Sequence, residues 1–208
     1  KLASWVSDDD PDPWLVPGTT VNLDYNPWCA NPECTAQVVE VSNAAGLQAA
    51  LDSASSGSTI RVNAGTYSQA DAFTINTDGL TLILEDGVVI YNELASCFVV
   101  YADYTYILGA SKAGARCRPG WSGSLLSGGH PGIYAPEAIH NFVLDGIEID
   151  GSGLQTGAGI YLGGGGSDIQ ILNNYIHDLS FDGLMSPAIL DGEELSGVVD
   201  IRGNLFQR

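Results

Sequence analysis

An internal repeat constrains the fold of this chain more than any other feature of its 208 residues. The tripeptide Gly-Ile-Tyr at 132–134 recurs 27 residues later, at 159–161. Apolar residues downstream recur at the same offset, with Phe142, Leu144 and Ile149 corresponding to Ile169, Ile171 and Ile176. The second set recurs after a further 30 residues, as Val199, Ile201 and Phe206. A repeat of this length with glycine at its corners is typical of stacked coils of three short strands, which bury their inward residues only by stacking.

Short β-strands are also expected upstream of the repeat, because the apolar residues after Ser58 follow a period of two. These strands are expected at 60–62, 73–75, 80–84, 88–91, 98–101 and 104–108. The sequence therefore predicts an all-β solenoid. An antiparallel sandwich is the alternative, because Asp-Gly pairs that suit hairpin turns occur at 86–87, 145–146, 182–183 and 191–192.

One helix is expected, at about residues 43–55. Ser42 or Asn43 can cap its start, and Leu47 and Leu51 follow at helical spacing together with two alanines. Gly57 ends it. The apolar face is narrow and made mostly of small residues, which suits a helix that lies on a flat surface.

Residues 1–40 differ in composition from the rest and are expected to form an extended arm. They hold three of the four tryptophans and five of the nine prolines, a proline density that forbids a helix. They also hold a group of acidic residues, Asp8, Asp9, Asp10 and Asp12. Their oxygens could chelate Ca²⁺, although the group lacks the glycine and distal glutamate of an EF-hand loop. A solvated acidic arm is the alternative, and no other cofactor is expected.

The four cysteines are expected to form two disulfides, Cys29–Cys34 and Cys97–Cys117. Neither spacing is a Cys-x-x-Cys motif, and the three histidines do not complete a zinc pattern with them. Free buried thiols are the alternative. Disulfides would place the protein in an oxidising, extracellular compartment.

Several segments resemble the secreted right-handed parallel β-helix proteins of the pectate-lyase-like superfamily. Residues 41–51, 57–62 and 64–67 are similar to the amphipathic capping helix and first coil of those proteins. The sequence Asn-Asn-Tyr-Ile-His-Asp at 173–178 resembles their coil repeat. The resemblance implies a β-helix over 41–208 with an N-terminal capping helix. It implies little about activity, because the same coil serves lyases, hydrolases, adhesins and fibres.

A basic, glycine-rich segment at about 111–132 is expected to be an insertion on the flank of the solenoid. Lyases of the superfamily use arginine or lysine as a base, so the resemblance makes Lys112, Arg116 and Arg118 the candidates for proton abstraction or binding. Trp121 and His130, with Arg116, are the candidate ligand-binding residues, because an indole ring stacks well on flat ligands. The alternative is a disulfide-tied loop whose cations offset nearby carboxylates.

Two other motifs are expected to be structural. Asn-Thr-Asp-Gly at 76–79 matches a fragment of a hydrolase motif, but its expected partners are absent downstream, so a turn is expected. His177 is expected to be a hydrogen-bonded histidine at a turn. Asn174 and Asn204 occupy equivalent places in the repeat, where stacked side-chain amides would form a ladder.

The net charge of −18, from 7 basic and 25 acidic residues, argues against a nucleic-acid partner, since a polyanion needs a positive surface. It also weakens any assignment with a strongly acidic polysaccharide as ligand. No stretch reaches the roughly 20 apolar residues that a membrane span needs.

The last repeat is expected to leave an apolar interior and a strand edge in need of a cover. Further residues of a longer protein, the arm at 1–40 of the same chain, or another copy of the chain could supply it. The sequence therefore predicts a secreted β-helix scaffold that self-associates end to end, as a subunit of an extracellular surface assembly or filament, with a possible polysaccharide partner. A polysaccharide lyase or glycoside hydrolase, whole or as a fragment, is the first alternative. A non-catalytic glycan-binding module is the second.

Overall fold

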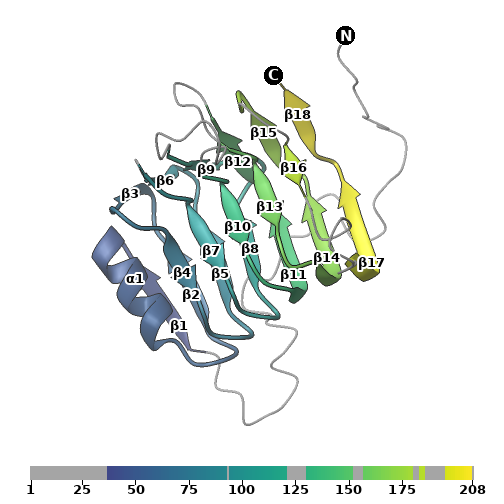
Figure 1. Ribbon diagram of the computed structural model, residues 1–208. Helices are drawn as coiled ribbons and strands as arrows, with labels where there is room; N and C mark the ends of the chain where they lie inside the picture. The colour runs from purple at the N-terminus through teal and green to yellow at the C-terminus, as the bar shows by residue number, and fades with distance from the viewer. Residues whose placement is uncertain are drawn as a thin grey trace.

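A computed structural model describes residues 37–92, 94–120, 130–151, 157–179, 183–185 and 195–207 (Figure 1). In this part of the chain, three parallel β-sheets and one helix account for the regular structure. The fold is therefore all-β with a single helix at one end. No helix in the described part is long and apolar enough to cross a membrane.

The strands belong to a seven-stranded, a six-stranded and a five-stranded sheet. The seven-stranded sheet contains β1 (Val38–Val41), β2 (Thr59–Val62), β5 (Thr81–Leu84), β8 (Tyr106–Gly109), β11 (Ile139–Asp145), β14 (Gly166–Leu172) and β17 (Leu195–Arg202). The six-stranded sheet contains β3 (Gly65–Ser68), β6 (Val88–Tyr91), β9 (Ala115–Arg118), β12 (Ile147–Asp150), β15 (Tyr175–His177) and β18 (Leu205–Gln207). The five-stranded sheet contains β4 (Phe73–Ile75), β7 (Phe98–Val100), β10 (Ile133–Ala135), β13 (Ile160–Leu162) and β16 (Leu184–Met185).

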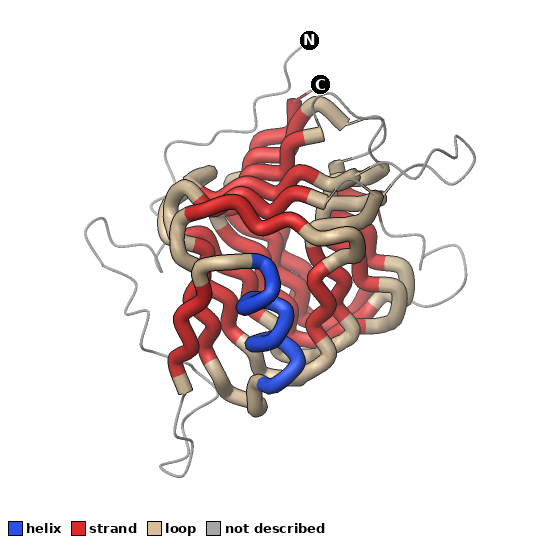
Figure 2. The backbone as a smooth tube through the Cα atoms, turned by 90° about the vertical axis from the view of Figure 1, so that its left-hand side faces the viewer, coloured by secondary structure: helices blue, strands red, loops and turns tan. Residues whose placement is uncertain are grey.

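From β2 onward the chain visits the three sheets in the same rotation. From β5 onward, each strand pairs with the strand three elements earlier, and every pairing in the described residues, including that of β2 with β1, is parallel. Seen from the helix end, the three sheets surround a common interior (Figure 2). The antiparallel sandwich considered from the Asp-Gly pairs is therefore wrong, since hairpins would pair consecutive strands antiparallel.

The sequence repeat is the strand register of this arrangement. Ile133 pairs with Ile160 and Phe142 with Ile169, so the 27-residue offset is confirmed as one pass around the three sheets. The 30-residue offset is confirmed in the same way by the pairing of Ile171 with Ile201.

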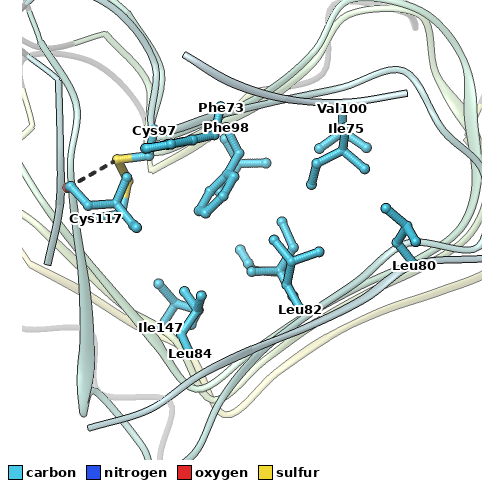
Figure 3. Packing of buried hydrophobic residues seen from close by; sticks show 14 of the residues in the cluster. Phe73, Ile75, Leu80, Leu82, Leu84, Cys97, Phe98, Val100, Cys117 and Ile147 are labelled. Carbon is cyan, nitrogen blue, oxygen red and sulfur yellow. Dashed lines mark hydrogen bonds between the residues drawn. A yellow bond between two sulfur atoms is a disulfide. The ribbon is translucent and has the colours of Figure 1, made fainter. Parts of the chain in front are cut away.

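The core is a stack of inward side chains from successive passes (Figure 3). Phe73 on β4 lies next to Phe98 on β7, with ring centroids 6.1 Å apart, and both are buried. Leu82 on β5 lies in register with Ile107 on β8, and neither has exposed surface. Each pass therefore covers the apolar residues of its neighbour, which stabilises a stack that no single pass could maintain.

The repeat glycines let neighbouring passes approach closely. A Cβ on Gly132 would lie 2.7 Å from Ile149 Cγ2 and 2.8 Å from the carbonyl oxygen of Gly159. A Cβ on Gly159 would lie 2.6 Å from Ile176 Cγ2. Any side chain at these two corners would force the passes apart, which explains why glycine opens both copies of Gly-Ile-Tyr.

The helix α1 (Ala44–Ser53) covers the end of the stack formed by the first strands (Figure 2). Asn43 caps it through its side-chain Oδ1, which accepts a hydrogen bond from Gly46 N at 2.8 Å. Leu47 and Leu51 are buried against the core, whereas Asp52 faces solvent. The helix expected at about 43–55 is therefore present, with an apolar face inward and a polar face outward.

Three local expectations need correction. The arm expected over 1–40 ends earlier, because Val38–Val41 forms β1 and pairs with β2; residues 1–36 lie outside the described part. The insertion expected at about 111–132 does not begin at 111, because Ala115–Arg118 forms β9 between β6 and β12. Strand β3 was missed as well, because glycine and polar residues surround its one buried side chain, Tyr67.

Candidate functional site

A group of charged side chains lies on the outward face of the six-stranded sheet, where β9, β12 and β15 are neighbours. The inward positions of these strands carry core residues such as Ile149, so the alternate residues point outward. Arg116 pairs in register with Glu148, and Asp150 pairs with His177. We call Arg116, Arg118, Glu148, Asp150 and His177 the charged cluster.

Two arginines on β9 neutralise two carboxylates on β12. Arg116 Nε donates a hydrogen bond to Glu148 Oε2 at 2.8 Å, and its Nη1 lies 3.7 Å from Asp150 Oδ2. Arg118 Nε lies 3.6 Å from the same Asp150 oxygen, and its guanidinium is 5.7 Å from the ring centroid of Tyr91. Positively charged side chains on β9 therefore lie next to negatively charged side chains on β12.

Both carboxylates of the cluster are buried although they face outward. Glu148 is 8% exposed and Asp150 is 5% exposed. A buried carboxylate is costly unless it is paired and hydrogen-bonded, so the arginines are necessary for this arrangement. The hydrogen bond to Glu148 is the main cause that raises the pKa of Arg116 above its ordinary value.

His177 joins β15 to the cluster through both ring nitrogens. Its Nδ1 lies 2.8 Å from Asp178 Oδ2, and its Nε2 lies 3.0 Å from Glu148 Oε1. The ring also stacks on Tyr175, with centroids 4.2 Å apart. Burial lowers the pKa of His177, but the hydrogen bonds to Asp178 and Glu148 outweigh it, and the net pKa is raised. The imidazolium form, in which both nitrogens donate, is therefore favoured.

Glu148, Asp150 and His177 are the residues of the described part that could hold a metal ion. Each offers one ligand atom, and these atoms lie within 4.8 Å of one another. However, Arg116 and Arg118 already contact the two carboxylates. A cation would have to displace those guanidinium groups. The Ca²⁺ site predicted at Asp8, Asp9, Asp10 and Asp12 lies outside the described residues.

The structure separates the residues that the sequence grouped as one basic site. Lys112 is exposed in the turn between β8 and β9, whereas Arg116 and Arg118 are on β9 itself. His130 is half-buried just before β10, and burial lowers its pKa. Trp121 lies outside the described residues. The ion pairs of the two arginines agree with the alternative interpretation, in which the cations offset nearby carboxylates.

Sequence reasoning missed Glu148 and Asp150. They occur in Ile-Glu-Ile-Asp at 147–150, where they look like ordinary solvent-facing residues of an alternating strand. A signal was present, because Ala-Arg-Cys-Arg at 115–118 has the same alternation with the opposite charge at the outward positions. Placing these two strands side by side would have brought the four charges together.

The predicted structural motifs can be placed directly. Asn174 Nδ2 donates to Asn204 Oδ1 at 3.0 Å, so the amide ladder is confirmed. Asp78 lies in a turn and accepts a hydrogen bond from the backbone N of Asp103, as expected of a turn residue. The disulfide Cys97–Cys117 is confirmed and buried in the core (Figure 3). The pair Cys29–Cys34 lies outside the described residues.

A second surface feature lies on the outward face of the five-stranded sheet. Tyr134 on β10 and Tyr161 on β13 are in register, and their rings meet edge to face with centroids 5.5 Å apart. Burial and, after it, the neighbouring Tyr161 and Tyr101 raise the pKa of Tyr134. Tyr101 is 45% exposed. The three tyrosines therefore form an aromatic surface on a different sheet from the charged cluster.

A third feature is the end of the stack opposite α1, where β17 and β18 are the outermost strands (Figure 1). Ile171 and Ile176 are 0% and 1% exposed, whereas their register partners Ile201 and Phe206 are 44% and 45% exposed. Five of the eight large apolar residues exposed in the described part are on these two strands: Val198, Val199, Ile201, Leu205 and Phe206. In the part of the chain that the structure describes, the register partners of core residues are thus exposed at this end.

Comparisons with known proteins do not identify a family for this chain. No family model, no curated protein and no solved structure matches the chain significantly.

Proposed function

We propose that this chain is a right-handed parallel β-helix of the pectate-lyase-like kind, secreted, and that it works as a scaffold module completed by another copy of itself. The rotation of the chain through three parallel sheets supports the β-helix assignment. A buried disulfide between Cys97 and Cys117 supports an oxidising, extracellular location.

One observation supports the scaffold function most strongly, namely the exposure of core positions on β17 and β18. Ile201 and Phe206 continue columns of side chains that are otherwise buried. Covering such side chains is worth on the order of 1 to 2 kcal/mol each when most of their surface leaves water. Within the described ranges, no strand pairs with the outer edge of β17 or β18, and such an edge presents backbone groups to a further strand. An apolar layer with an open edge is thus suited to association.

Light scattering coupled to size-exclusion chromatography, across a dilution series of the oxidised chain, tests this function. We expect a species of at least twice the 21.8 kDa chain mass that dissociates on dilution. Val198→Asp, at a side chain 62% exposed on β17, should weaken the association. Val38→Asp, at a side chain 50% exposed on β1 at the opposite end, is the matched control and should not. A stable monomer at the highest concentration would contradict the proposal.

A non-catalytic glycan-binding module is a second candidate, favoured by the aromatic surface of Tyr101, Tyr134 and Tyr161. Rings and hydroxyl groups on one face suit the apolar faces and hydroxyls of sugars. Calorimetric titration with neutral and uronate-containing oligosaccharides tests it. Binding that Tyr134→Ala removes and Tyr175→Ala, on another sheet, leaves intact would favour this function.

The lyase alternative with Arg116 or Arg118 as the base gains no support from the charged cluster. A base must be able to lose its proton near neutral pH, and the hydrogen bond to Glu148 raises the pKa of Arg116. The decisive assay remains product formation from uronate-containing glycans, followed as ultraviolet-absorbing or reducing ends. Activity that Arg116→Ala abolishes would restore this alternative.

A further inference from the structure

We propose, building on the self-association proposed above, that the second copy packs tail to tail. In this arrangement β17 pairs with its own counterpart, antiparallel, about a two-fold axis through Ile201. The result is a closed dimer in place of an open filament, because both exposed ends are used in one contact.

The two ends of the stack are chemically different. At one end, α1 turns its large apolar residues inward and exposes Ala45, Ala49, Asp52 and Ser53. None of the large exposed apolar residues of the described part belongs to α1. Stacking head to tail would place Ile201 and Phe206 against this helix face and against β1, where the exposed apolar residues are two alanines and Val38. Stacking tail to tail places Ile201 against its own counterpart in the second copy.

The edge of β17 suits pairing with another strand. It is the outermost strand of the seven-stranded sheet in the described part and, at 8 residues, the longest of that sheet. Its inner edge is hydrogen-bonded to β14, and no strand of the described residues pairs with its outer edge. A two-fold axis makes two copies of the same edge antiparallel, a geometry that β-strands readily adopt.

The outward residues of β17 set the register. Asp200 and Arg202 lie on the same outward face, and Arg202 Nε lies 3.0 Å from Asp200 Oδ2. Antiparallel pairing about Ile201 places Asp200 of one copy opposite Arg202 of the other, twice in each dimer. Registers shifted by two residues in either direction place like charges opposite each other, which is unfavourable. The inward residue Ile201 meets its own counterpart in the joined core.

An exchange of these two charges tests the arrangement without altering the core. We expect D200R and R202D each to be monomeric under conditions in which the wild-type chain is a dimer by light scattering. A 1:1 mixture of the two variants should recover a dimer, because every cross-strand pair then joins an arginine to an aspartate. D52R, on the exposed face of α1, is the matched control and should dimerise like wild type. Circular dichroism checks that each variant is folded, and D200K with R202E repeats the exchange if the first pair is not.

The remaining outcomes of the charge exchange distinguish the two-fold arrangement from the scaffold function. Variants that dimerise on their own, or a mixture that stays monomeric, would overturn the two-fold arrangement. In that case a wild-type dimer would leave the scaffold function intact. Loss of association in D52R would show head-to-tail stacking and would overturn the proposal as well. A wild-type monomer would contradict the scaffold function itself.

Discussion

Arg116 on β9 donates a hydrogen bond to Glu148 on β12 across two neighbouring passes of the chain, with 2.8 Å between Nε and Oε2. The carboxylate is buried, whereas the side chain of Arg116 is 45% exposed. This contact offsets the cost of burying the Glu148 carboxylate, and it links β12 to the neighbouring strand β9.

Removing this arginine should destabilise the fold. Arg116→Ala leaves Glu148 buried with fewer partners, and we expect a loss of about 1 to 2 kcal/mol in the free energy of unfolding. The expected loss is no larger because Arg116 is partly exposed, and solvent screens its charge. Arg61→Ala is the control, since its ion pair with Glu85 is 3.6 Å long, and it should cost less than about 1 kcal/mol. Urea denaturation measures both, and equal losses would contradict the account of the cluster.

Removing an asparagine of the ladder should lower the free energy of unfolding more than Arg116→Ala does. Asn174 is fully buried, donates to the carbonyl of Leu144 at 3.0 Å and accepts from the N–H of Ile147 at 2.9 Å. Asn174→Ala removes both bonds and leaves the Ile147 N–H without its side-chain acceptor, so we expect a loss of about 2 to 4 kcal/mol. Asn204→Ala, which affects the partly exposed next rung, should cost clearly less. Denaturant midpoints rank the two variants, and the reverse order would count against the ladder as a stabilising element.

The contacts of His177 predict that stability falls as pH rises above about 6.5, the ordinary pKa of histidine. The folded chain has the higher pKa, so it holds this proton more tightly than the unfolded chain does. The stabilisation is complete below the unfolded pKa and is lost as pH rises through the folded pKa. Unfolding midpoints with EDTA between pH 6 and 8.5 should decline for wild type and less steeply for His177→Gln. Equal slopes would contradict the prediction.

The buried disulfide should contribute about 3 kcal/mol by restricting the unfolded chain. Cys97 and Cys117 are 20 residues apart in sequence, and both are at most 1% exposed. We expect Cys97→Ala/Cys117→Ala to unfold at a lower urea concentration, and we expect the native protein to resist reductant until it unfolds. Thiol labelling under native and denaturing conditions checks the second point. Rapid labelling of the folded chain would show that the bond is accessible.

The strands that belong to the internal repeat could be predicted from the sequence. The offsets of 27 and 30 residues proved to be strand registers, and the pairs Ile133–Ile160 and Ile171–Ile201 could be read directly from them. The helix could be located as well, because Leu47 and Leu51 have helical spacing next to the capping Asn43. These features depend on local pattern and on equivalent residues in successive passes.

The charged cluster could not be predicted in the same way, because it depends on which strands are neighbours. Arg116 and Glu148 are 32 residues apart in sequence, an offset that differs from both repeats. The glycine-rich composition near Arg116 favoured a loop, but pairing on both sides keeps residues 115–118 in a strand. Tertiary pairing thus overrode the local signal.

The most direct test of the central claim is a cysteine at the proposed two-fold axis. In Ile201→Cys, the new thiol lies against its own counterpart in the tail-to-tail dimer, so mild oxidation should yield a covalent dimer on a non-reducing gel. Val38→Cys, at the opposite edge of the same sheet, should remain monomeric. A covalent dimer from Val38→Cys and none from Ile201→Cys would contradict the account.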